Sequence, residues 1–223
     1  MANLFNSFDP VTFSFFSLNW SSSMLMMLII PPMFWLIPSR LTMLWIKIIF
    51  FMHNEFKILL KNKNFNGSTI FFSSMFTFIM LNNFLGLFPY IFTSTSHLNF
   101  SLTLSLPMWM SFMMYGWIKN TNHMFTHLVP QGAPNILLPF LVIIESISNI
   151  IRPMTLAIRL SANMIAGHLL MTLMGNSGSN LNLSLLIILI NTQMLLLILE
   201  SAVTIIQSYV FSILTTLYSS ETS

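Results

Sequence analysis

Long stretches without a charged side chain restrict the fold of this chain more than any other feature of its sequence. A helix needs about 20 apolar residues to cross a bilayer core that is about 30 Å thick. Uncharged stretches include residues 10–39, 64–118, 160–199 and 201–220. Together they have room for about five such helices, so the sequence predicts an all-α integral membrane protein with about five transmembrane helices.

The composition excludes other classes of protein. Charged residues make up 6% of the chain, whereas a soluble domain has about a quarter, because water must solvate its surface. Hydrophobic residues make up 55%, which is too many for a disordered chain. The chain contains no cysteine, so it has neither a disulfide framework nor a thiolate metal site. We therefore predict a single membrane domain over residues 1–223, and we expect no nucleic-acid partner because no basic patch is present.

The N-terminal part is predicted to contain one span and one helix at the membrane surface. Residues 1–39 hold the first span, whose end is marked by three prolines. Residues 40–63 hold five of the eight basic side chains, and Arg40, Lys47 and Lys61 recur at multiples of seven, on one face of a helix. Such an amphipathic helix lies in the membrane interface. By the positive-inside rule this segment lies on the matrix or cytoplasmic side, and the N-terminus lies on the other side.

The rest of the chain is predicted to form two spans, a loop and a long hairpin. Two spans fit within residues 68–118, and residues 119–134 form a loop that contains the turn-forming sequence PQGAP. Residues 135–174 and 181–218 are each nearly twice as long as one span, and a short loop of Gly, Ser and Asn joins them. They either break at internal prolines or lie steeply inclined, and we favour a steeply tilted antiparallel hairpin.

Ionisable side chains inside the hairpin are the main functional candidates, because they are costly in lipid. They are Glu145, Arg152, Arg159, His168 and Glu200. The first three recur every seven residues and drift by only about 20° per step, so they share one stripe of a helix. The second helix repeats polar residues at the same spacing, namely Gln193, Glu200 and Gln207.

Two interpretations of these charges remain open. In the first, the charges simply pair, Glu145 with Arg152 and Glu200 with Arg159, or Arg152 extends toward the membrane interface. In the second, the side chains form a polar path, because one structural ion pair does not require the further polar residues that share these helices. The further residues include Asn163, His168, Gln193 and Gln207.

Residues 156–170 read LAIRLSANMIAGHLL and resemble the most characteristic segment of the subunit a family of F-type ATP synthases. Supporting matches follow in the same order over nearly the whole chain. They are NFLGLFP at 83–89, PQGAP at 130–134, IESIS at 144–148 and ESAVTIIQ at 200–207. The mitochondrial branch of this family has His at the position of His168 and an acidic residue at that of Glu200, so the sequence resembles the mitochondrial type.

The resemblance implies a proton-translocating stator subunit that faces a rotating ring of c subunits. In this family an arginine, here Arg159, separates two offset aqueous half-channels and faces the rotor carboxylate. His168 and Glu200 would then belong to the half-channel on the intermembrane-space side. Glu145 lies about 21 Å along the helix from Arg159, toward the matrix, and would belong to the matrix half-channel.

The resemblance also implies supporting residues, partners and a location. Asn163 and Gln207 are expected to support these groups by hydrogen bonds, whereas Arg152 is assigned no essential role. Expected partners are the c-subunit ring, peripheral-stalk and other membrane-sector subunits, the lipid bilayer and protons. The implied location is the mitochondrial inner membrane, with the N-terminus toward the intermembrane space and the C-terminus toward the matrix. The first residues lack a basic segment and a cleavage site, so we expect no removable signal peptide.

Other functions are also compatible with parts of the sequence. A passive ion channel or a secondary transporter without a rotor is the main alternative, although no internal repeat is visible. An electron carrier or an intramembrane protease fits less well, because His168 is the only histidine firmly inside a span and Asp9 is the only aspartate. No glycine-rich nucleotide loop occurs, so we expect no cofactor and no bound metal, and ATP chemistry would belong to partner subunits.

Overall fold

Helices form the regular structure of this chain. The computed structural model describes residues 4–12, 16–60, 67–129 and 137–222. Its α-helices are α1 (Met26–Ile29), α2 (Arg40–Leu59), α3 (Ser68–Gly86), α4 (Leu98–Lys119), α5 (Thr121–Leu128), α6 (Leu138–Ser177) and α7 (Leu183–Thr222). Short 3₁₀ helices are η1 (Leu4–Phe8), η2 (Leu18–Met24), η3 (Ser94–Ser96) and η4 (Gly178–Asn180). The predicted all-helical class is confirmed.

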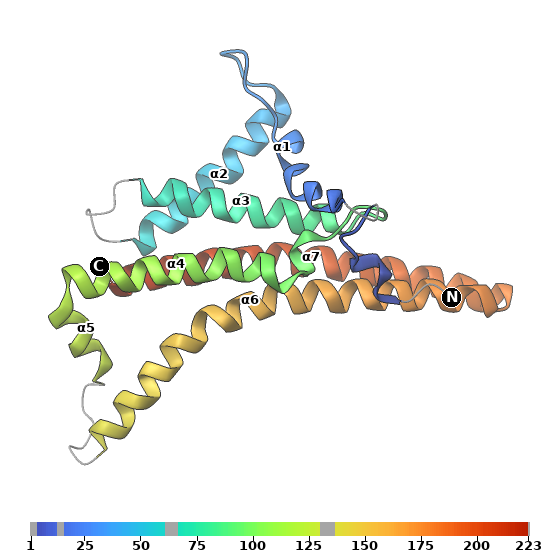
Figure 1. The fold of residues 1–223 in the computed structure, drawn as a ribbon. Coiled ribbons are helices and arrows are strands. Elements are labelled where there is room, and N and C mark those ends of the chain that lie inside the picture. Colours follow the sequence, from blue (N-terminus) through green and yellow to red (C-terminus); the bar gives the residue numbers. More distant parts are fainter. Residues whose placement is uncertain (1–3, 13–15, 61–66, 130–136, 223) are drawn as a thin grey trace.

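The two longest helices, α6 and α7, form the predicted antiparallel hairpin (Figure 1). Each has 40 residues and runs without interruption, although Pro153 lies inside α6. The N-terminal half of α6 curves away from α7, as expected where a proline removes a backbone hydrogen bond. At 1.5 Å per residue each helix is about 60 Å long, about twice the thickness of a bilayer core. Such helices fit a membrane only when they run obliquely through it.

The remaining long helices pack against this hairpin. Contacts are most extensive between α3 and α7 and between α4 and α6. By length and composition, α3, α6 and α7 are able to cross a membrane. Helices α3 and α4 lie within residues 68–118, where two spans were predicted, and of these two only α3 meets this criterion among the described residues.

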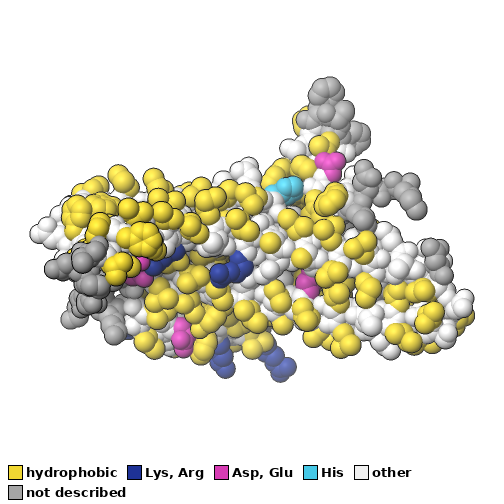
Figure 2. Space-filling view, turned by 90° about the horizontal axis from the view of Figure 1, so that it is seen from below, with side chains coloured by type: hydrophobic (Ala, Val, Ile, Leu, Met, Phe, Trp, Pro, Cys, Tyr) yellow, Lys and Arg dark blue, Asp and Glu magenta, His cyan; other side chains and the backbone are white. Residues whose placement is uncertain are grey.

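The interior of the bundle is more polar than much of its surface. On α7, Ser208, Ser212 and Thr216 are fully buried, whereas Leu195 and Leu199 are exposed. The buried hydroxyls donate to carbonyl oxygens one turn earlier at 2.7–2.8 Å, so they need no further partner. Figure 2 shows a surface on which hydrophobic side chains predominate and charged groups are few. This distribution is the reverse of a soluble protein and suits a lipid environment.

The predicted first span contains less helix than expected. Its helical turns, η2 and α1, end at Ile29, and residues 30–39 are not helical. The cause is the pair Pro31 and Pro32, since proline lacks an N–H donor and disfavours the helical conformation of the residue before it. Ile30 is accordingly extended.

The amphipathic helix α2 begins at the predicted residue. The Ser39 side chain caps it by accepting a hydrogen bond from the backbone N–H of Thr42 at 3.4 Å. Met52 and Phe56 then pack against Phe72 of α3. The helix ends at Leu59, and the last residues of the predicted segment lie outside the described part of the chain.

The segment predicted as a loop at residues 119–134 contains the short helix α5. No glycine or proline occurs between Thr121 and Leu128, so no residue there interrupts the helix. The turn-forming sequence PQGAP that supported the loop prediction lies outside the described residues.

Candidate functional site

A buried carboxylate on α7 lies against a glycine on α6. The Glu200 side chain is only 6% exposed, and its Oε1 has no hydrogen-bond partner among the described residues. A Cβ atom added to Gly167 would overlap this carboxylate and would come within 3.1 Å of its Cγ. The two helices therefore approach closely enough for Glu200 only because residue 167 lacks a side chain.

His168 follows this glycine and joins two further elements to the site. Its imidazole hydrogen-bonds to the backbone of Gly86, at the C-terminal end of α3. Its ring also meets the Phe8 ring of η1 edge-on, with centroids 6.2 Å apart. The buried Nε2 has no partner in the described part of the chain. The N-terminal segment, α3, α6 and α7 thus converge around His168.

Asn83 is a candidate that the sequence interpretation did not single out. It lies on α3, one turn before Gly86, and is fully buried. Neither its amide nitrogen nor its amide oxygen has a hydrogen-bond partner among the described residues, although buried amides are almost always paired. The sequence feature that could have identified Asn83 was its position at the start of the matching segment at 83–89. Asn83, Gly167, His168 and Glu200 are called the loop-side cluster below.

Arg159 lies on a different, exposed face of α6. Asn163 is one turn further along the same helix and is also exposed. The Asn163 Nδ2 donates a hydrogen bond to the Oε1 of Gln207 on α7, at 3.0 Å. This bond connects the two helices beside Arg159, and the Arg159 guanidinium itself remains outside the ion pairs found among the described residues.

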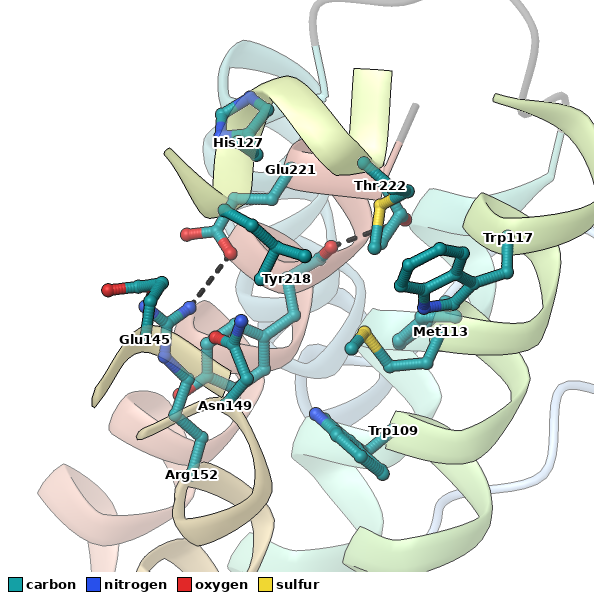
Figure 3. Close-up of a pocket in the computed structure, with 13 residues that line it drawn as sticks. Trp109, Met113, Trp117, His127, Glu145, Asn149, Arg152, Tyr218, Glu221 and Thr222 are labelled. Carbon is teal, nitrogen blue, oxygen red and sulfur yellow. Dashed lines mark hydrogen bonds and ion pairs between the residues drawn. The ribbon is translucent and has the colours of Figure 1, made fainter. Parts of the chain in front are cut away.

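A second group of charged side chains lies between the N-terminal half of α6 and the end of α7 (Figure 3). The Arg152 guanidinium lies 2.9 Å from Glu221 and 3.5 Å from Glu145. It also lies over the Tyr218 ring, 5.5 Å from its centroid. These side chains border a cavity of about 140 Å³ that α4 and α5 close from the other side. Glu145, Arg152, Tyr218 and Glu221 are called the C-terminal cluster below.

The simple pairing of charges is thus correct for one pair and wrong for the other. Glu145 does pair with Arg152, and Arg152 also pairs with Glu221. Glu200 and Arg159 form no ion pair in the described structure, because Glu200 is buried and Arg159 is exposed on the outer face of α6. The described residues also contain no group of three acidic or His side chains that could hold a metal ion.

Comparison with known proteins gives one consistent family. The model of the ATP synthase A chain family matches residues 11–220. The ATP synthase subunit a of Locusta migratoria is 64% identical over 222 residues, and those of Aedes aegypti and Drosophila melanogaster are 62% and 60% identical over 226 and 221 residues. Each match covers 99% of this chain and 99% of the relative.

Proposed function

This chain belongs to the ATP synthase subunit a family and is a membrane-sector subunit of the F-type enzyme in the mitochondrial inner membrane, and we propose that Arg159 is the residue through which it couples proton flow to rotation. In this proposal the chain offers two offset half-channels to a ring of c subunits. Arg159 separates the half-channels and faces the rotor carboxylates.

The position of Arg159 between two polar clusters is the observation that supports this proposal most strongly. His168 is nine residues further along α6, about 14 Å by helical rise, and Glu145 is about 21 Å away in the other direction. The side chain is exposed and is not part of either ion pair among the described residues. It is therefore free to meet an acidic group on a neighbouring subunit.

The chemistry of arginine suits this role. A guanidinium stays protonated at any accessible pH, whereas a buried lysine can lose its proton. A rotor carboxylate that arrives opposite Arg159 is favoured as the anion, so it releases its proton into one half-channel. After it moves on, it takes up a proton from the other half-channel. The fixed positive charge also repels protons that would otherwise cross directly, and the membrane potential supplies about 2.3 kcal/mol per charge per 100 mV.

The two clusters are the proposed half-channels. The loop-side cluster, with Glu200, His168 and Asn83, takes up protons from the intermembrane space during synthesis. Its unpaired buried polar atoms are groups that bind water or protons. The C-terminal cluster, with Glu145, releases protons to the matrix. This assignment requires the N-terminus to face the intermembrane space and the C-terminus to face the matrix.

Substitution of Arg159 tests the proposal. Arg159→Ala in the assembled enzyme, reconstituted in vesicles, should abolish ATP-driven proton pumping and gradient-driven ATP synthesis. Hydrolysis by the soluble sector should persist, because this chain has no nucleotide site of its own. Arg40→Ala, an exposed arginine on α2, is the matched control and should pump normally. Coupled pumping by Arg159→Ala at the control rate would refute the assignment.

A further inference from the structure

The charged side chains of the C-terminal cluster form part of the wall of a cavity. It is lined by aromatic and thioether side chains of α4 and α5 on one side and by the charged groups on the other (Figure 3). A volume of about 140 Å³ accommodates several water molecules. The polar wall is therefore in contact with water, while the aromatic wall limits where the charged side chains can move.

Arg152 uses different atoms for its two carboxylates. Its Nη1 lies 2.9 Å from Oε2 of Glu221, and its Nη2 lies 3.5 Å from Oε1 of Glu145. The first distance is that of a charge-assisted hydrogen bond, whereas the second is a looser ion pair. The Tyr218 ring beneath the guanidinium adds a third contact at 5.5 Å. Glu221 and Tyr218 thus anchor the guanidinium, and Glu145 is oriented by it.

Both anchors come from the last turns of α7, and Arg152 and Glu145 come from α6. The side chains of Arg152, Glu145 and Glu221 are 33%, 40% and 50% exposed. Ion pairs this exposed contribute little to stability, because water solvates the separated charges well. A role in orienting Glu145 explains the arrangement better than a role in holding the fold together.

We propose that Arg152 is a positioning residue for proton release, which holds the Glu145 carboxylate at the wall of this cavity and is itself anchored by Glu221. The inference rests on the proposed function of Glu145 in the matrix half-channel. It gives a role to Arg152, to which the family resemblance assigns none. The inference also gives the C-terminal end of α7 a part in proton release, because its Glu221 anchors Arg152 and Arg152 holds Glu145.

The test measures gradient-driven ATP synthesis by the assembled enzyme in vesicles, divided by soluble-sector hydrolysis to correct for the amount of complex. Arg152→Gln should slow synthesis about tenfold, because a misplaced proton-transfer group is inefficient. Arg152→Lys, which keeps the charge but has one nitrogen in place of the planar guanidinium, should recover part of the rate. In a Glu145→Gln background, Arg152→Gln should lower the synthesis rate by less than about a further twofold. The reason is that the effects of substituting residues that act through one another are not additive.

The control is Glu55→Gln, which removes a carboxylate on α2 outside the cavity and should leave the rate unchanged. An equal loss from Arg152→Gln with and without Glu145 would overturn the inference and leave Arg152 a structural residue. If Arg152→Gln prevents assembly, Glu221→Gln replaces it in the test, because the Glu221 side chain is half-exposed. A loss in synthesis rate that disappears in the Glu145→Gln background supports the inference, and an unchanged synthesis rate overturns it. If Glu145→Gln alone has no effect, the proposed role of Glu145 itself fails.

Discussion

The two polar clusters of the hairpin differ in the burial and the pairing of their ionisable side chains. In the C-terminal cluster, Glu145 and Glu221 share one arginine, and all three side chains are partly exposed. In the loop-side cluster, Glu200 is buried without an ion pair in the described structure, beside the unpaired Nε2 of His168. The first cluster compensates its charges in part, with two carboxylates against one guanidinium, whereas Glu200 in the second has no opposite charge paired with it among the described residues.

This difference sets how much each cluster costs the stability of the fold. An unpaired carboxylate in a low-dielectric interior is strongly disfavoured as the anion and has a large cost unless it is protonated or hydrated. A half-exposed, paired carboxylate has almost no such cost. Glu200 is therefore the residue whose removal should reduce transport most while costing the fold least, and the substitutions below test that contrast.

Among the substitutions that test this contrast, replacement of Glu200 should give the largest effect. Glu200→Gln keeps the shape but removes the titratable group, so proton uptake should slow about 100-fold, a usual loss for a proton-transfer group. Because the wild-type carboxylate has no ion pair with the described residues, the melting temperature of the complex should stay the same or rise. ATP synthesis rate and thermal unfolding of the assembled enzyme measure the two quantities. Normal synthesis with a lower melting temperature would make Glu200 structural and would remove the contrast.

Displacement of the same carboxylate should have a smaller effect. Gly167→Ala places a methyl group where the Glu200 carboxylate lies, so the side chain must move. Since it is flexible, it adapts in part, and we expect synthesis to slow about tenfold. Gly175→Ala on the same helix is the matched control, because its nearest non-local atom would be the Gln193 Nε2 at 3.9 Å. Equal rates for the two alanine variants would contradict the close approach at Gly167.

Loss of the hydrogen bond between the clusters should have the smallest effect. Gln207→Leu removes the acceptor of the Asn163 bond at nearly constant volume. One such bond contributes about 1 kcal/mol, so we expect a loss in synthesis rate of about fivefold or less. Gln193→Leu, on the same face of α7 but outside this bond, serves as the control. A loss as large as that of Glu200→Gln would mean that Gln207 belongs to the proton path itself.

Much of the fold was predictable because it depends on local sequence. The uncharged stretches predicted the long helices, and the unbroken hairpin through Pro153 agrees with the steeply tilted arrangement rather than with shorter pieces. The helical extent of the first span was overestimated, because residues 30–39 were included in it although Pro31 and Pro32 end its helical turns at Ile29. The helix α5 was missed for the opposite reason, since the neighbouring PQGAP sequence suggested a loop for the whole segment.

Part of the candidate site was also predictable. Spacing identified the pair of Glu145 and Arg152, because residues seven apart on a helix lie on one face. Spacing could not identify Glu221, which is 69 residues from Arg152, nor the buried Asn83. Contacts of this kind depend on which helices become neighbours, and that information is not local.

The sequence by itself determined that the chain lies in lipid, which segments form its long helices, and which few side chains lipid disfavours. These properties follow from hydropathy and helical periodicity, which depend on neighbouring residues. The tertiary structure alone decided which of the scarce charges are compensated. It buried Glu200 beside Gly167 without an ion pair to any residue that the structure describes, and it joined Glu145 and Glu221 through Arg152. The physical reason is that the cost of a charge depends on its surroundings in space, which helix packing sets.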